Sequence, residues 1–393
     1  MVIKNRKYWQ KLIEDLWREK SILWLSGVRR TGKTCLCQSV PGIEYFDCEL
    51  PRTRRLMEDP ESFLSMFKGK RIVLDEIHRL ANPSELLKIA ADYFPNVKII
   101  ATGSSTLGAS AKFKDTLTGR KTEMWLTPMI TEDLIDFGNT DIMHRLHRGG
   151  VPPFFLARKY PERDFQEWLD AYWAKDIQEL FRLERRFSFQ RFLELLFMQS
   201  GGVFEATKFA RPCEVSRTTI HNYLSVLEAT FVVQVIRPFN TYRTTEIISA
   251  PKVYSFDTGF ICHYKGWESI RSEDLGLLWE HFVLNEIQAR FQKRNLLYWR
   301  DKRHHELDFV LQKNSKEMIA VECKWSAEHF DPTSLKAFRH IYNRGQNYVV
   351  AHDVQRAYLH EYKGLKVGFV SLDQLISNLK TPIQPPLTAD VKS

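Results

Sequence analysis

Residues 27–34 read Gly-Val-Arg-Arg-Thr-Gly-Lys-Thr and fit the pattern G-x-x-x-x-G-K-[ST]. Glycines in this pattern let the backbone curl around an anion with its N–H groups pointing inward. The ammonium of Lys33 would neutralise the β- and γ-phosphates of a nucleotide, and the hydroxyl of Thr34 would ligate Mg²⁺. An apolar run at 22–25 precedes the loop as a strand, and a helix-compatible run at 35–38 follows it, so a helix N-terminus would face the phosphates. The residues expected to bind ATP here are Gly27, Arg30, Thr31, Gly32, Lys33, Thr34 and Cys35.

The bulk composition describes an ordinary globular protein of two or three domains, with 393 residues, 44% of them apolar and 27% charged. The net charge of +9 favours an anionic partner such as nucleic acid, although a generally basic surface explains the charge equally well. The six cysteines show no metal-ligand spacing, and reduced thiols fit a cytoplasmic protein. Because no apolar run approaches membrane-spanning length and the first 20 residues do not read as a signal peptide, we expect no membrane association.

Residues 1–145 alternate between strand-like and helix-like runs, which predicts a parallel sheet covered by helices on both faces. The expected strands are Ile22–Leu25, Gly42–Asp47, Arg71–Leu74, Val97–Thr102 and Lys121–Leu126. Residues 146–248 read as packed helices with a helix-turn-helix element, and residues 249–376 return to mixed α/β. The last residues, 377–393, are proline-containing and are expected to form a flexible tail.

A second element of nucleotide chemistry follows the apolar run Ile72–Leu74, which leads directly into Asp75 and Glu76. A buried strand that ends in two carboxylates is typical of a Walker B element. Asp75 would hold Mg²⁺ through water, and Glu76 would orient or deprotonate the attacking water. This second carboxylate distinguishes a hydrolase from a protein that only binds nucleotide.

The next expected strand ends at Thr102, and Ser104 follows within Gly103-Ser104-Ser105. A polar side chain there can hydrogen-bond the γ-phosphate or the attacking water, as a sensor 1 residue does, although a plain Gly-Ser turn is the alternative. Arg120 lies just before the following strand. It could reach the nucleotide of a neighbouring subunit and stabilise charge in the transition state, or it could be a solvated arginine.

Together these motifs resemble the AAA+ ATPases of bacteria and archaea that carry a C-terminal domain of unknown function. Further matches are Gly149-Gly150-Val151-Pro152, Pro251-Lys252-Val253-Tyr254 and Asp257-Thr258-Gly259, whereas Pro128-Met129-Ile130 departs from the Pro-Leu-Ser common in the family. The resemblance implies a P-loop AAA+ core, a winged-helix region and a restriction-endonuclease-like C-terminal domain. It covers nearly the whole chain.

The middle region has the order helix, turn, helix, strand, wing that is typical of a winged helix. A short helical run at 204–210 is followed by a turn and by a helix from Arg217 that Ser216 would cap, with a strand at 231–236 and a possible wing through Tyr242 and Arg243. The alternative is a module that packs subunits or lids. The residues that would face a DNA groove are Arg217, Thr218, Thr219, His221 and Asn222.

Two apolar strands near the C-terminus, 306–311 and 318–325, flank a polar turn and read as a hairpin. Asp308 and Glu322 are equidistant from Ser315 and would lie opposite each other, as would Glu306 and Lys324. Alternation would put these four on one face and core residues on the other. Facing carboxylates repel unless a cation or proton intervenes, so Asp308 and Glu322 are candidate ligands of Mg²⁺ or Mn²⁺.

This Asp…Glu-x-Lys pattern resembles the PD-(D/E)XK nucleases, with Glu280 in a helical run as the upstream acid. The resemblance implies that Lys324 would orient or activate water against a phosphodiester. The alternative is a carboxylate–lysine cluster on a fold that has lost catalysis. The leading hypothesis is an ATP-hydrolysing, homo-oligomeric AAA+ protein acting on nucleic acid, in the first place DNA. A nucleotide-gated switch or scaffold with a protein partner, or a branch-migration-type motor, would instead carry an inert nuclease fold.

Overall fold

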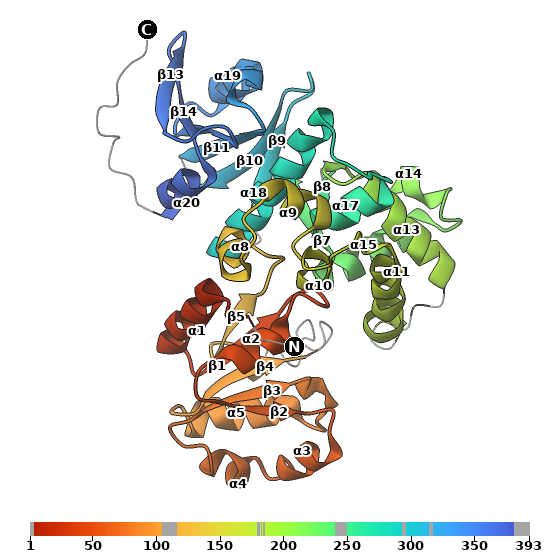
Figure 1. The fold of residues 1–393 in the computed structure, drawn as a ribbon, viewed down its shortest axis with the longest axis vertical. Helices are drawn as coiled ribbons and strands as arrows, with labels where there is room; N and C mark the ends of the chain where they lie inside the picture. Colours follow the sequence, from red (N-terminus) through yellow and green to blue (C-terminus); the bar gives the residue numbers. More distant parts are fainter. Residues whose placement is uncertain are drawn as a thin grey trace. The chain divides into compact units, whose positions relative to one another are not determined.

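The computed structural model describes residues 4–103, 116–178, 181, 183, 185–239, 250–292, 296–313 and 317–380. The chain forms two compact units (Figure 1). Unit 1 comprises residues 1–192 and 210–233, and unit 2 comprises residues 193–209 and 234–393. Helix α13 (Arg186–Met198) contributes residues to both units. We describe each unit by itself.

Unit 1 is built on a parallel sheet of five strands within the described residues, in the order β2-β3-β4-β1-β5. These strands are β1 (Ile22–Ser26), β2 (Ile43–Asp47), β3 (Arg71–Asp75), β4 (Lys98–Thr102) and β5 (Lys121–Trp125). β4 lies between β1 and β3. The predicted parallel sheet is confirmed, and each strand lies within a residue or two of its expected bounds.

In unit 1, α1 precedes β1, further helices alternate with the strands, and a helical region follows β5. They are α1 (Lys7–Glu19), α2 (Lys33–Ser39), α3 (Pro51–Leu56), α4 (Pro60–Ser65), the 3₁₀ turn η1 (Ile77–Arg79), α5 (Pro83–Tyr93), α8 (Thr131–Phe137), α9 (Ile142–Arg148), α10 (Pro152–Phe155), α11 (Glu162–Ala171), the π-helical segment η2 (Tyr172–Gln178) and α15 (Arg217–Ala229). No helix in the described part of the chain has the length and apolar character needed to cross a bilayer.

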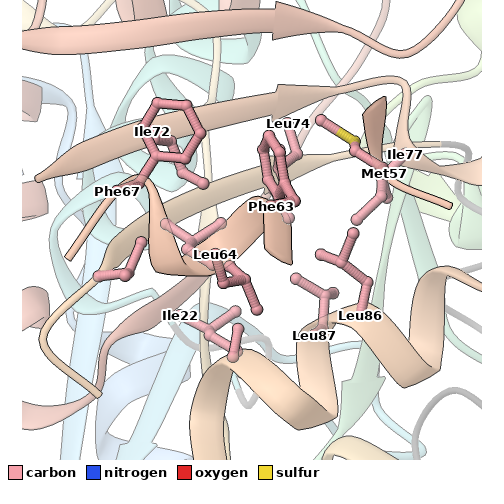
Figure 2. Packing of buried hydrophobic residues seen from close by; sticks show 14 of the residues in the cluster. Ile22, Met57, Phe63, Leu64, Phe67, Ile72, Leu74, Ile77, Leu86 and Leu87 are labelled. Carbon is pink, nitrogen blue, oxygen red and sulfur yellow. The ribbon is translucent and has the colours of Figure 1, made fainter. Parts of the chain in front are cut away.

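The core of unit 1 forms where α4 and α5 pack against β1 and β3. Figure 2 shows Phe63 and Leu64 of α4 and Leu86 and Leu87 of α5 pointing toward the apolar side chains of the strands. Parallel strands buried on both faces are nearly continuously apolar, and β1 accordingly reads Ile-Leu-Trp-Leu. This core fixes the carboxyl ends of β1, β3 and β4 at one edge of the sheet, where the motif residues follow.

Unit 2 contains a mixed sheet in the order β13-β14-β12-β11-β10-β9-β7-β8-β6. Its strands are β6 (Gly202–Val203), β7 (Val233–Pro238), β8 (Lys252–Ser255), β9 (Leu297–Arg300), β10 (Glu306–Gln312), β11 (Met318–Lys324), β12 (Asn347–Ala351), β13 (Tyr358–Tyr362) and β14 (Leu365–Val370). Its helical elements are α14 (Ala206–Ala210), α17 (Thr258–Tyr264), η3 (Ser272–Asp274), α18 (Leu275–Phe291), η4 (Ala327–His329), α19 (Thr333–Ile341) and α20 (Leu372–Lys380).

The hairpin of β10 and β11 forms in the predicted register, with Phe309 opposite Val321 and Leu311 opposite Ile319. The predicted strict alternation of polar and core faces is wrong along β10. Leu307 and Val310 pack into the same core cluster beside α19, because the register of β10 on β9 shifts between these two residues. Such an irregularity turns the strand and re-aims the side chains within it, and here it includes Asp308.

Candidate functional site

The loop at 27–34 has the backbone conformation that its glycines allow. Gly27 has a φ of 142°, and a Cβ atom there would lie 2.4 Å from the carbonyl oxygen of Leu126. Gly32 has a φ of 95° and precedes α2 in the left-handed region. Both positions therefore require glycine. Arg30 also has a positive φ, of 66°, and Cys35 is exposed at the start of α2.

A buried ion pair formed by residues outside the loop supports the loop. The guanidinium of Arg6 donates to both carboxylate oxygens of Asp133, with an Nε–Oδ1 distance of 2.8 Å, and its Nη1 donates to the carbonyl of Thr31 at 2.9 Å. The indole of Trp9 also donates to Asp133, at 3.1 Å. Both charged side chains are almost fully buried, so they are held by each other and by these hydrogen bonds. Sequence reasoning missed Arg6 and Asp133, because they lie outside any motif.

The side chain of Lys33 bends back onto the loop itself. Its ammonium donates to the carbonyl oxygens of Gly27 at 2.8 Å and Val28 at 3.1 Å. Burial lowers the pKa of Lys33, while the nearby carboxylates of Asp176 and Glu76 act in the opposite direction. The ammonium is thus positioned by the loop that would carry the phosphates.

Asp75 gathers three hydroxyl groups at the end of β3. The hydroxyl of Thr34 donates to its Oδ2 at 3.0 Å, and the hydroxyls of Tyr45 and Thr102 donate to the same carboxylate. Burial and the hydrogen bond to Asp75 raise the pKa of Tyr45. The structure therefore brings Thr34, Asp75 and Thr102 together as the motifs suggested. Tyr45 on β2 is an additional member that no motif indicated.

Glu76 follows in a strained conformation, with a φ of 54°. Its backbone N–H donates to the hydroxyl of Thr102 at 3.1 Å. Its carboxylate oxygen Oε2 lies 3.2 Å from Nδ1 of His78, and the hydrogen bond from His78 lowers the pKa of Glu76 although burial opposes this shift. Glu76 is therefore held as a carboxylate beside Thr102, which suits a residue that orients or deprotonates water.

A residue from the helical part of unit 1 also joins the loop. Asp176, in the π-helical segment, accepts a hydrogen bond from Nε of Arg29 at 2.7 Å, and the indole of Trp168 donates to the carbonyl of Arg29 at 3.2 Å. Burial raises the pKa of Asp176, against the opposing charges of Arg29 and Lys33. π-Helical segments occur frequently at functional sites. Sequence reasoning missed Asp176, because nothing in the helical pattern of 161–199 singles it out.

One of the predicted nucleotide-site residues, Arg120, does not join this group. Arg120 forms a two-bonded ion pair with Asp92 at the end of α5, with Nε–Oδ1 and Nη2–Oδ2 distances of 2.7 and 3.1 Å. Ser104 lies outside the described residues. A role of Arg120 toward a neighbouring subunit stays a prediction.

The predicted groove-facing residues lie on the first turns of α15. Arg217, Thr218, His221 and Asn222 are exposed, while the apolar stripe of the helix is buried. The N-cap is confirmed, because the hydroxyl of Ser216 accepts from the N–H of Thr219 at 3.1 Å. The hydroxyl of Thr219 itself lies 2.9 Å from that of Ser216, within this cap. Tyr242 and Arg243, the expected wing, lie outside the described residues.

In unit 2, the register of β10 and β11 extended by one residue sets Asp308 opposite Glu322. Oδ2 of Asp308 accepts from the backbone N–H of Cys323 at 2.7 Å, and Oε2 of Glu322 lies 3.0 Å from the ammonium of Lys324. Burial raises the pKa of Glu322 to about 8, and the charge of Asp308 adds to this shift. The two acids therefore influence each other, as their predicted proximity requires.

Glu280 of α18 completes the group of acids. It accepts from the hydroxyl of Tyr254 at 2.5 Å and lies 3.3 Å from the ammonium of Lys252, both on β8. Burial raises the pKa of Glu280 to about 7, with the charge of Asp308 as the next cause. Lys252 also lies 2.7 Å from Oε1 of Glu306. Sequence reasoning quoted Lys252 and Tyr254 in a family match but gave them no role.

The acids of unit 2 have partners within the chain, and the assignment of Asp308 and Glu322 as metal ligands stays a prediction. Within the described ranges, no group of three or more His, Cys, Asp or Glu side chains is placed to hold a metal ion. Glu280 and Glu322 face the ammonium groups of Lys252 and Lys324, and Asp308 accepts a backbone N–H. One oxygen of each of these carboxylates therefore accepts a hydrogen bond from the chain itself.

Comparisons with known proteins divide the chain into three regions. Residues 19–135 match the model of an AAA domain, residues 139–271 match a domain of unknown function (DUF8612), and residues 275–367 match another (DUF4143). The similar proteins Rv2008c of Mycobacterium tuberculosis and Mb2031c of Mycobacterium bovis are each 28% identical over 326 residues, covering 79% of this chain and 72% of theirs. MJ1544 of Methanocaldococcus jannaschii is 22% identical, covering 81% and 78%. All three are described as uncharacterized.

Solved structures show only weak likeness to this chain. The Walker-type ATPase PABY2304 of Pyrococcus abyssi has a TM-score of 0.43 at 16% identity, covering 67% of this chain and 96% of its own. AMPPCP-bound DnaA from Aquifex aeolicus has a TM-score of 0.30 at 13% identity, covering 57% and 88%. Likeness at this level does not bear on function. The AAA-domain match coincides with the phosphate loop, the Asp75–Glu76 pair and the parallel sheet that positions them. Residues 19–135 are therefore similar to an AAA domain and carry the phosphate loop and the acidic pair of a P-loop ATPase on a parallel sheet.

Proposed function

We propose that this protein couples ATP hydrolysis in unit 1 to an action on nucleic acid, and that the region of DUF4143 similarity in unit 2 is a PD-(D/E)XK nuclease-like domain that contacts the nucleic acid. The observation that carries the proposal is the register of β10 on β11, which, continued by one residue beyond Phe309 and Val321, sets Asp308 opposite Glu322. Lys324 follows on β11, and Glu280 on α18 is influenced by the charge of Asp308. The net charge of +9 supports an anionic partner.

The ATPase half of the proposal assigns a task to each loop residue. Lys33 would bind the β- and γ-phosphates, and Glu76 would orient or deprotonate water. The hydroxyl of Thr34 and the carboxylate of Asp75, 3.0 Å apart, offer the oxygen ligands that Mg²⁺ prefers. When bound, Mg²⁺ would neutralise charge on the phosphates. Thr102, which hydrogen-bonds both Asp75 and the N–H of Glu76, would act as the sensor residue.

The remaining elements of the proposal concern partners. Arg120 would leave its pair with Asp92 to reach the nucleotide of a neighbouring subunit, which makes the protein a homo-oligomer through its ATPase domain. The exposed residues Arg217, Thr218, His221 and Asn222 at the start of α15 would contact DNA in the manner of a recognition helix. We propose that the protein acts in the cytoplasm.

A second candidate is a nucleotide-gated switch or scaffold whose nuclease-like fold binds a partner without cutting DNA. The observation that favours it is the supply of donors to Glu280, Asp308 and Glu322 from the chain itself. A metal ion would have to compete with these donors for the carboxylates.

One set of assays tests the proposal. ATP turnover is measured with and without plasmid DNA, and binding of labelled plasmid DNA is measured separately. Both assays are run with and without Mn²⁺ on the wild type, Lys33→Ala and Asp308→Ala. We expect turnover that DNA stimulates and that Lys33→Ala abolishes, with DNA binding retained in Asp308→Ala. A chain that neither binds DNA nor responds to it in turnover contradicts the action on nucleic acid. DNA integrity in the same reactions separates cleavage from binding, and equal cleavage by Asp308→Ala would identify a contaminating nuclease.

A further inference from the structure

Lys252 lies in an unusual place for a lysine. Its side chain is 5% exposed, and its ammonium lies 2.7 Å from Oε1 of Glu306 and 3.3 Å from Oε1 of Glu280. It also lies within electrostatic reach of Asp308. A buried ammonium is retained only where anions pair with it. Lys252 thus places an ammonium directly on Glu280 and Glu306, beside the acids that a nuclease would use to hold its metal ion.

The backbone fixes Lys252 in this place. In β8, Lys252 is paired with Val203 of β6, and the carbonyl of the preceding Pro251 accepts from the N–H of Phe204 at 2.7 Å. Its ammonium also lies over the rings of Tyr254 and Tyr298 at 5.6 and 5.8 Å. Lys252 belongs to the region of DUF8612 similarity, whereas the acids belong to that of DUF4143 similarity. The cation is therefore supplied from outside the region that carries the carboxylates.

We propose that Lys252 is a built-in counter-cation that replaces a divalent metal in the nuclease-like domain. A divalent ion binds carboxylate oxygens at about 2.0–2.6 Å, and it would have to share Glu280 with an ammonium already held there. The two cations would repel each other across a buried site. The wild-type chain therefore takes no Mg²⁺ or Mn²⁺ at Asp308 and Glu322, and unit 2 binds nucleic acid without cutting it. This last statement rests on the proposed function.

The test is Mn²⁺ binding to the full chain without nucleotide, followed by titration calorimetry or by the loss of the free-ion electron paramagnetic resonance signal. The wild type and Asp308→Ala should bind Mn²⁺ equally, since any ion near Thr34 and Asp75 is common to both. Lys252→Met removes the charge and keeps the apolar length of the side chain. It should gain a Mn²⁺ site that the wild type lacks at the same ion concentrations, and Asp308→Ala in that background should abolish the gain.

Two control variants isolate the charge of Lys252. Lys252→Arg keeps a cation and should behave as the wild type. Lys313→Met removes an exposed lysine at the end of β10, whose ammonium is 3.9 Å from Glu317, and should gain no Mn²⁺. Lys252→Met should also unfold at a lower temperature in EDTA and recover in Mn²⁺, because the metal would replace the lost charge.

Two results would overturn the proposal. The first is Mn²⁺ binding by the wild type that is lost in Asp308→Ala. This comparison needs no Lys252 variant, so it tests the proposal even if Lys252→Met fails to fold. The second is a folded Lys252→Met that gains no Mn²⁺. DNA binding is measured on the same samples. Its absence would contradict the proposed action on nucleic acid and would leave the assignment of Lys252 untouched.

Discussion

The guanidinium of Arg6 donates a hydrogen bond of 2.9 Å to the carbonyl of Thr31, so a residue near the start of the chain holds the middle of the phosphate loop. The same guanidinium is paired with the fully buried Asp133. The nucleotide loop therefore depends on a charge that lies outside its own motif. This dependence leads to the first prediction.

Arg6→Ala should lower the free energy of unfolding of unit 1 by about 3–5 kcal/mol, because it leaves the carboxylate of Asp133 buried and unpaired. It should also weaken nucleotide binding, since the loop loses its support at Thr31. Chemical denaturation and binding of a fluorescent nucleotide would measure the two effects. Arg18→Ala, which removes an exposed ion pair with Asp15, is the control and should cost no more than about 1 kcal/mol. Equal effects of the two variants would contradict the prediction.

Glu76→Gln should keep nucleotide binding and lower the rate of ATP hydrolysis by about 10²–10⁴-fold, the usual contribution of general base catalysis. The amide preserves the shape of the side chain but cannot accept a proton from water. Single-turnover hydrolysis and equilibrium binding separate the two properties. Glu61→Gln, on the exposed first turn of α4, serves as the matched control. A normal rate in Glu76→Gln would remove Glu76 from the mechanism.

Gly27→Ala should destabilise unit 1 strongly, because its Cβ would lie 2.4 Å from a backbone oxygen of Leu126 at a φ of 142°. Backbone strain and the clash both contribute, so we expect a loss of about 2–4 kcal/mol. Gly42→Ala provides the comparison, because Gly42 has a φ of 67° with open space around its Cβ position and should cost only about 1–2 kcal/mol. Thermal unfolding of both variants checks the difference, which a similar melting temperature would refute.

The stability of the β10–β11 hairpin should rise as the pH falls from about 8 to about 5. Burial raises the pKa of Glu322 to about 8, so the folded chain holds a proton in this window that the unfolded chain releases. Stability from this group is complete below the unfolded pKa and is lost as the pH rises through the folded pKa. The slope should approach about 1.4 kcal/mol per pH unit for one such group. Hydrogen exchange of amides in β10 and β11 would measure it.

Glu322→Gln is the control for this pH dependence, because the amide is neutral at every pH in the window. The stability of its hairpin should depend less on pH than that of the wild type. The pH dependence that remains should come from Glu280, whose pKa is raised to about 7. A stability that rises with pH in the wild type would show that Glu322 is ionised in the folded chain.

Local patterns predicted much of unit 1. The strand before Gly27, the strand before Asp75 and the strand ending at Thr102 were each evident, because apolar runs and motif residues are contiguous in the sequence. The parallel sheet brings their ends together as expected. The register of the β10–β11 hairpin was also predictable, because the two strands flank one short turn.

The residues that were missed lie far apart along the chain. Arg6 and Asp133 meet across 127 positions and Arg29 and Asp176 across 147, so no local pattern could join them. The shift of β10 against β9 between Leu307 and Val310 depends on packing with a neighbouring strand and not on composition. Lys252 was visible only as part of a family match, since its partners Glu280 and Glu306 come together through the folded sheet.

The division of the chain between its units has a practical outcome for anyone trimming the gene. The polypeptide passes from one unit to the other after residues 192, 209 and 233. A chain that ends at residue 192 would lack residues 210–233, which belong to unit 1. A chain that ends at residue 233 would keep residues 193–209 without the rest of unit 2. Neither half can be obtained by a single truncation, so excision of 193–209 with a designed linker is the rational route to a free-standing ATPase.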